Sequence, residues 1–254
     1  GGKYAPSIIG VTTQSEVALA GTFTISAAQA VELNRRVTAT GTVECWGNGF
    51  IGRLGAGDRA DAASPVDVVG LENVDSVVAG AYHTCARRGD GTVACWGNNF
   101  DGQLGDGTRV PSDVPRDVLG VTGARQVGVG LFRSCALLED DRILCWGAYG
   151  PGTANPPTEV PGLPPIDSFA HAPELACALA RDGTVWCWQG YAGTNQPEQV
   201  PGITNAAKIS VGTYHSCAVL TDGTARCWGS NGFNQLGSNV TGFYSAVPVI
   251  VHEP

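Results

Sequence analysis

The sequence predicts an all-β protein, a β-propeller of five four-stranded blades, and three observations lead to this fold class. Glycine (36 residues) and proline (15 residues) are abundant and the apolar runs are short, as in turn-rich β structure. A tryptophan followed by glycine or glutamine recurs at intervals of 40 to 50 residues. Four short apolar runs accompany each recurrence, and four strands in a repeat of this length are typical of a propeller blade. The recurring tryptophans are Trp46, Trp96, Trp146, Trp188 and Trp228.

The central element of each repeat is a β-hairpin, clearest at residues 80–97, which read GAYHTCARRGDGTVACWG. A short apolar run contains Cys85, the glycines around Asp90 predict a turn, and a second run returns through Cys95 to Trp96. A less regular copy opens with GTFTISA and closes with TGTVECWG. The five hairpins are predicted near residues 21–47, 80–97, 130–147, 170–189 and 212–229.

Two further strands complete each repeat. An apolar strand precedes each hairpin, the first beginning at Glu16, and a proline-containing strand follows it. Four proline-containing strands lie between hairpins, and the fifth, residues 246–251, is the C-terminal one. We therefore expect residues 246–251 to complete the first blade, so that residues 1–254 form one closed domain without an open sheet edge. The alternative is a fragment of a longer array.

Eight of the nine cysteines form four pairs with a constant separation of ten residues. A turn at the middle of each pair places the two cysteines opposite one another on adjacent strands, close to disulfide distance. Disulfides, which indicate an oxidising compartment, are favoured; buried thiols and a metal site are the alternatives, although the spacing lacks the CxxC of zinc sites. The pairs are Cys85–Cys95, Cys135–Cys145, Cys177–Cys187 and Cys217–Cys227.

Cys45 is the remaining cysteine. Aligning GTFTIS with GAYHTC places Ser26 where the partner of Cys45 would stand. This alignment gives the first hairpin about nine extra residues, and it predicts that Cys45 is a free, buried thiol.

The aromatic candidate binding residues lie two positions after the glycine that opens four of the five hairpins, and the fourth hairpin has the irregular Ala172-Pro173-Glu174 instead. Propeller symmetry places equivalent positions in a ring around the central channel, and exposed aromatic residues are typical interface anchors. The alternative is that these rings pack between blades. The next residues along the chain are candidates for polar contacts, and tyrosines in two short loops border a predicted notch on one side of the ring. The candidates are Phe23, Tyr82, Phe132 and Tyr214, then His83, Arg133 and His215, then Tyr149 and Tyr191.

Other features limit the function. The net charge of −8 argues against binding to nucleic acid. No apolar window is long enough to cross a membrane, so no membrane insertion is expected. The sequence has no nucleophile elbow, HExxH, P-loop or dinucleotide motif, so no catalytic residue, metal or cofactor is predicted. The recurring tryptophans and the leucines of the GQLG-type turns are predicted to be buried between blades.

The strings HTCARRGDGTVACWGNNFDGQLGDGT (83–108) and HSCAVLTDGTARCWGSNGFNQLG (215–237) resemble repeats of the regulator-of-chromosome-condensation family. The resemblance extends from about residue 15 to the end of the chain. It implies a propeller, of seven blades in most members. Nuclear members act as exchange factors on a small GTPase and dock on chromatin, whereas similar bacterial proteins include secreted β-lactamase inhibitors and cell-surface proteins.

Three functions follow as expectations. The first is a non-enzymatic module, secreted, periplasmic or at the cell surface, that binds a protein partner through one face. The second is a structural or self-associating surface protein, and therefore a homo-oligomer. The third is an enzyme or inhibitor with a site in the central channel or the notch. The acidic charge and the paired cysteines favour the first over a nuclear role.

Overall fold

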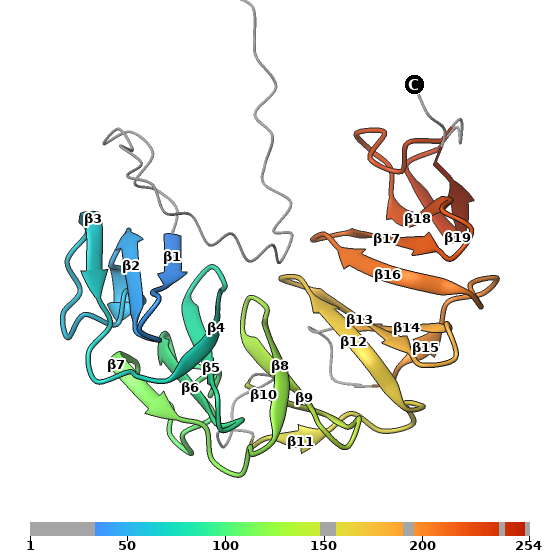
Figure 1. The fold of residues 1–254 in the computed structure, drawn as a ribbon. Coiled ribbons are helices and arrows are strands. Elements are labelled where there is room, and N and C mark those ends of the chain that lie inside the picture. The colour runs from blue at the N-terminus through green and yellow to red at the C-terminus, as the bar shows by residue number, and fades with distance from the viewer. Residues whose placement is uncertain (1–33, 148–155, 190–195, 239–241, 252–254) are drawn as a thin grey trace, which may run out of the picture.

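The computed structural model describes residues 34–147, 156–189, 196–238 and 242–251, which form five antiparallel sheets along an arc (Figure 1). Four of the sheets have four strands, and three strands of the first sheet are described. The predicted all-β fold with five blades is therefore confirmed. Among the described residues, no helix is long and apolar enough to cross a membrane.

Each sheet is built from strands that are consecutive in the chain. The first sheet has β1 (Asn34–Val37), β2 (Val43–Gly47) and β3 (Ala62–Asp67), with a short 3-10 helix (Phe50–Gly52) after β2. The second has β4 (Val74–Ala79), β5 (His83–Arg88), β6 (Val93–Gly97) and β7 (Ser112–Asp117). The third has β8 (Ala124–Val129), β9 (Arg133–Leu138), β10 (Ile143–Gly147) and β11 (Thr158–Glu159). The fourth has β12 (Ile166–His171), β13 (Leu175–Ala180), β14 (Val185–Gln189) and β15 (Glu198–Gln199), and the fifth has β16 (Ala206–Val211), β17 (His215–Leu220), β18 (Ala225–Ser230) and β19 (Tyr244–Ile250).

The strand order sets which residues face the middle of the molecule. The leading strands β4, β8, β12 and β16 lie on the concave side of the arc (Figure 1). The last strands β7, β11, β15 and β19 are the opposite edge strands of their sheets, and β7 and β19 contain proline. An edge position suits proline, which cannot donate a hydrogen bond to a neighbouring strand. In each four-stranded sheet, the hairpin turn lies at one end of the strands, and the loops that connect the hairpin to the first and last strands lie at the other end. These two sets of loops therefore lie on two different faces of the molecule.

The hairpin turns have a common local cause. In the second sheet, the Arg88 N–H donates to the carbonyl of Thr92 at 2.9 Å, and the Asp90 carboxylate accepts from the N–H of Thr92 at 2.9 Å. Gly91 has a φ of +76°, a conformation that glycine adopts without strain. In the third sheet Asp141 takes this position with a φ of +68°.

The apolar core lies between consecutive sheets rather than at one centre. One cluster joins Val43, Cys45 and Leu54 of the first sheet to Ala86 and Trp96 of the second, and similar clusters join the later sheets. The predicted burial of the turn leucines is confirmed, since Leu54, Leu104 and Leu236 are fully buried. Trp96, Trp146, Trp188 and Trp228 are also buried as predicted, and Trp46 is half-buried.

The tryptophan of one sheet also donates a hydrogen bond to the loop of the preceding sheet. The Trp96 indole N–H donates to the carbonyl of Arg53 at 3.0 Å, and Trp146 donates to the carbonyl of Gln103 at 3.0 Å. A Cβ atom on Gly55 would lie 2.7 Å from the Trp96 indole nitrogen, so this close approach requires glycine. The glycine and leucine of these turns are therefore explained by packing.

All four predicted cysteine pairs lie at disulfide distance. Their cysteines stand directly opposite one another in the hairpin register, with Cα atoms 4.0 to 4.1 Å apart. Cys45 is free and buried among the described residues, as predicted.

The prediction for the first hairpin is wrong in its bounds. The hairpin is 34–47 rather than 21–47, and Arg35, not Ser26, stands opposite Cys45. The Thr38 N–H donates to the carbonyl of Thr42, which reproduces the turn of the other hairpins without extra residues. The physical reason is that the turn around Gly41, with a φ of +76°, sets which residues of the two strands pair. The resemblance of GTFTIS to GAYHTC is a similarity of sequence that does not determine this pairing.

The prediction for the C-terminal strand is also wrong. β19 pairs with β18 of the fifth sheet, with Arg226 opposite Ile250, and does not complete the first blade. The first and fifth sheets lie at the two ends of the arc (Figure 1). Only residues 231–243 separate β18 from β19, so this pairing costs less loop entropy than pairing β19 with the first sheet at the far end of the chain.

Candidate binding face and central cavity

Exposed aromatic side chains lie at the same end of the first, second and fifth sheets, where the second strand of each hairpin ends. The loops at this end are tied together, since the Asn98 N–H donates to the carbonyl of Tyr82 and the Ser230 N–H to the carbonyl of Tyr214, both at 2.9 Å. We name this surface the aromatic face. Its most exposed rings, 58% to 93% accessible, are Phe50, Phe100, Tyr214, Phe233, Phe243 and Tyr244.

Two of the predicted candidates contact each other on the aromatic face. The rings of Tyr82 and Phe132, from adjacent sheets, are stacked with centroids 6.0 Å apart and planes inclined by 20°. Both side chains are half-buried, so each packs against its neighbour and still presents one side to solvent. Tyr214 is exposed in the fifth sheet. The predicted ring of aromatics is therefore brought together in part.

The remaining aromatic candidates cannot be placed on this face. Phe23, Tyr149 and Tyr191 lie outside the described residues. In the corrected alignment Arg35 is the equivalent of Cys85. The residue three positions earlier in the sequence, equivalent to Tyr82, is therefore Glu32 and not Phe23. The notch predicted beside the short loops also falls on residues outside the described ranges.

His83 and Arg133 are not available to a partner, contrary to our expectation. Their side chains are 0% and 7% exposed, because the next sheet covers the hairpin on which each lies. His215, the equivalent residue of the fifth sheet, is partly exposed. The covering sheet is distant in sequence, which explains why the repeat alone did not reveal this burial.

His83 forms a buried pair with Ser134 of the third sheet, with Nε2 and Oγ 2.8 Å apart. The Ser134 hydroxyl donates to the carbonyl of Gln103 at 2.9 Å, so its single proton is used there and His83 Nε2–H must donate to Ser134 Oγ. Burial, with a smaller effect of His171, lowers the pKa of His83 to about 3. The imidazole is therefore neutral and holds the two sheets together; it is not accessible to a substrate.

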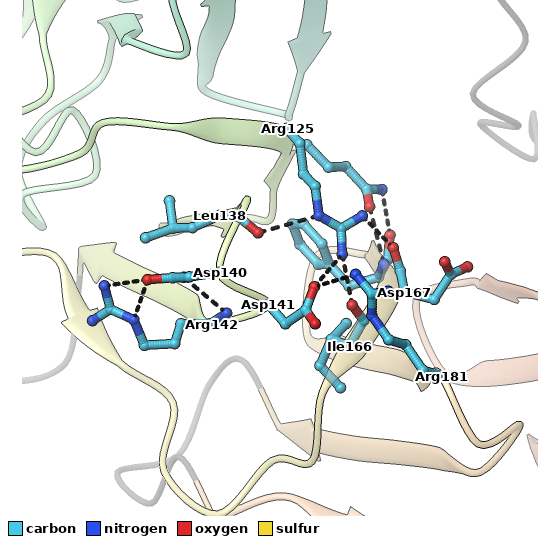
Figure 2. Close-up of polar contacts among 10 residues, drawn as sticks. Arg125, Leu138, Asp140, Asp141, Arg142, Ile166, Asp167 and Arg181 are labelled. Carbon is cyan, nitrogen blue, oxygen red and sulfur yellow. Dashed lines mark hydrogen bonds and ion pairs between the residues drawn. The ribbon is translucent and has the colours of Figure 1, made fainter.

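The opposite end of the sheets carries charged turns instead of aromatic rings. Figure 2 shows the carboxylate of Asp141, in the turn of the third sheet, accepting from Arg125 at 3.2 Å and from Arg181 of the fourth sheet at 2.8 Å. Arg125 also donates to the carbonyls of Ile166 and Asp167 of the fourth sheet. Because both arginines hold Asp141 by hydrogen bonds, its pKa is lowered. This network joins two sheets and is structural.

A cavity of about 550 Å³ lies among the inner strands. Its polar lining comes from four sheets and includes Arg35 of β1, Gln126 of β8, Ser168 and His171 of β12, and Lys208 of β16. Burial first, and the charge of Arg133 second, lower the pKa of His171 to about 4, so the ring is neutral at pH 7. Among the described residues, no group of three or more His, Cys, Asp or Glu side chains is arranged to hold a metal ion.

Sequence reasoning missed the most exposed part of the aromatic face. Phe50, Phe100 and Phe233 each follow the tryptophan of a Trp-Gly pair by four or five residues. This recurrence of an aromatic residue in a glycine- and asparagine-rich loop was a readable signal. The same loops also contain the buried leucines, and that structural role was taken to explain the whole loop.

Two sequence profiles, both described as "Regulator of chromosome condensation (RCC1) repeat", match the chain. One matches residues 74–103 and 206–235, and the other matches residues 40–87 and 90–137. Together they cover half of the sequence. No curated protein matches the sequence significantly.

Solved structures with a similar fold include three proteins of low sequence identity. Human WBSCR16 superposes with a TM-score of 0.75 at 20% identity, covering 87% of this chain and 65% of its own. Yeast RCC1 (Prp20), solved bound to Kap60, superposes with a TM-score of 0.73 at 17% identity, covering 87% and 59%. Prp20p of Saccharomyces cerevisiae, described with its binding properties to Gsp1p and histones, gives 0.73 at 19% identity, covering 87% and 61%. The chain thus spans less than two thirds of the length of these structures.

Proposed function

Because the chain belongs to the family of regulator of chromosome condensation (RCC1) repeat proteins, we propose that it is a non-enzymatic module that binds a protein partner through its aromatic face. The observation that carries this proposal is the set of six exposed aromatic rings at the same end of the first, second and fifth sheets. Aromatic residues are enriched among the anchors of protein interfaces, and several of them on one face are typical of a surface that binds a partner.

The pattern of exposure separates this face from the rest of the surface. Phe100 and Phe233 occupy loops whose buried leucines already secure them, so neither ring is needed for packing. Phenylalanine exposed to water is costly unless a partner covers it. The stacked pair of Tyr82 and Phe132 gives the same face a firm, preorganised apolar surface.

The compartment is part of the proposal. Four cysteine pairs at disulfide distance favour an oxidising environment, so the partner is expected outside the cytosol, in the periplasm, on the cell surface or in the medium. The similar yeast protein was solved bound to Kap60 and is described with its binding properties to Gsp1p and histones. Those partners belong to the yeast protein, and we propose a different partner for this chain because of its paired cysteines.

The test begins by identifying the partner with a photocrosslinker placed at Phe233 and then measures binding of the purified partner. Phe100→Ala, Tyr214→Ala and Phe233→Ala should each weaken binding about ten-fold or more if the ring is an interface anchor. Leu119→Ala is the matched control, since Leu119 is 57% exposed but follows β7 at the other end of the sheet. Unchanged affinity in all three aromatic variants would contradict the proposal.

A second candidate, self-association, is favoured by the fifth sheet. Val219 is 42% exposed, whereas the equivalent Leu137 and Leu179 are buried by the next sheet. Val247 and Ile250 on β19 are exposed as well. Light scattering on wild type and on Val219→Asp tests this candidate. A wild type that is monomeric at every concentration excludes it, and loss of an oligomer in the variant supports it.

A further inference from the structure

The central cavity has an unusual charge for this protein. The chain carries 23 acidic and 15 basic residues, yet no aspartate or glutamate is among the described residues that line the cavity. Two cations, Arg35 and Lys208, contribute to the lining from opposite ends of the arc (Figure 1). The described lining of the cavity is therefore positively charged, although the protein as a whole is acidic.

Arg35 lacks a carboxylate partner among the described residues. Its Nε–H donates to the carbonyl of Val77 at 3.4 Å, which uses one of its five donors. Burial lowers the pKa of Arg35, because removing the guanidinium from water disfavours its charge. A partly buried cation without a counter-ion is costly, and proteins compensate such a charge with an anion.

Lys208 provides the second charge. It is exposed on the inner strand β16, and no ion pair of Lys208 is found among the described residues. The hydroxyls of Ser168 and Ser210 line the same cavity. Hydroxyl and ammonium groups are both donors to oxygen anions. Cations and hydroxyls around one space are the donor set that an anionic oxygen group requires.

We propose that the central cavity is a binding site for an anionic ligand whose carboxylate or phosphate group is held by Arg35 and Lys208. The guanidinium provides paired donors to the oxygens, and Lys208 of β16 provides a second charge in the same cavity. The volume of about 550 Å³ is of the size found for small-molecule sites. The site is separate from the aromatic face, so it exists whether or not a protein partner binds there.

The proposal is tested on the full chain by calorimetric titration at low ionic strength with two probes, inorganic phosphate and glutarate. Wild type should bind at least one of them saturably, and the tighter of the two identifies the anionic group. Arg35→Gln and Lys208→Gln should each weaken this binding about ten-fold, as loss of a charge-assisted hydrogen bond does. If Arg35→Gln fails to fold, Lys208→Gln alone still decides, because Lys208 is exposed.

Two controls keep the result specific. Arg36→Gln removes the same charge one residue away, where the side chain is exposed and paired with Glu44 outside the cavity. An equal loss of binding in Arg36→Gln, or no saturable binding to wild type, would overturn the proposal. Glu32→Gln removes a carboxylate from the residues before β1. Binding that occurs in this variant but not in wild type would show that the chain itself neutralises Arg35, and would also overturn the proposal.

Discussion

Arg35 lies directly opposite Cys45 in the pairing of β1 with β2, at the two positions where the other hairpins carry a disulfide. The separation of ten residues is also the same. We therefore expect Arg35→Cys to form a fifth cross-strand disulfide. The chain-entropy estimate for so short a loop is a gain of about 2–3 kcal/mol in the free energy of unfolding, less whatever Arg35 contributes itself.

The gain is measured as the difference in unfolding free energy between the oxidised and reduced forms of the variant, compared with the same difference in wild type. Arg36→Cys is the control. Residue 36 stands opposite Glu44 and its side chain points to the other side of the sheet, so no bridge to Cys45 should form. A free thiol at residue 35 after oxidation would show that the register differs from the one described.

Cys45 should be unreactive in the folded protein. Burial raises the pKa of the Cys45 thiol to about 12, and the thiolate is the form that reacts with alkylating reagents. Intact mass after treatment with iodoacetamide should show no addition to the native protein and one addition after unfolding without reductant. Nine additions without reductant would mean that the four pairs are thiols, and would remove the argument for an oxidising compartment.

Cys217–Cys227 should be reduced before Cys85–Cys95 and Cys135–Cys145 under native conditions. Both sulfurs of the pairs in the second and third sheets are buried, whereas Cys217 is partly exposed because no described sheet covers β17. Access of the attacking thiolate limits exchange, so exposure sets the order. Timed alkylation followed by peptide mapping measures this order. Earlier loss of Cys85–Cys95 or Cys135–Cys145 would indicate that the fifth sheet is covered in solution.

The repeated features of the fold were readable because each hairpin carries its own local signals. Cysteine spacing, the turn glycine and the recurring tryptophan specify strand pairs within about 20 residues of one another, where pairing costs little entropy. The first hairpin was misplaced because Arg35 removes the cysteine that marked the others. Gly41 lies 50 residues before Gly91 and was the signal that gave the correct register.

The site was less readable because it depends on contacts between sheets. Nothing in the string HTC distinguishes His83, which the third sheet buries, from His215 in HSC, which no described sheet covers. Likewise, Arg35 and Lys208 face one cavity only because the arc brings β1 and β16 around the same space. Repeat symmetry predicts equivalent positions, but it does not predict which neighbour is present.

Stability should fall as the pH decreases from about 6.5, because two buried histidines resist protonation. The folded-state pKa values of His83 and His171 are lowered from 6.5 to about 3 and about 4, mainly by burial. Below pH 6.5 the unfolded chain binds protons that the folded chain does not, so the free energy of unfolding decreases with decreasing pH. Each histidine contributes at most about 1.4 kcal/mol per pH unit, until the pH reaches its folded pKa.

Urea unfolding at several values between about pH 6.5 and 4.5 measures this slope above the range in which carboxylates dominate. His83→Gln should make the slope shallower, since glutamine does not titrate and its amide N–H can still donate to Ser134. His171→Gln should act in the same direction, and the double variant should be the shallowest. A slope equal to that of wild type in His83→Gln would contradict the burial of a neutral His83, because a histidine with the same pKa in both states adds nothing to the pH dependence.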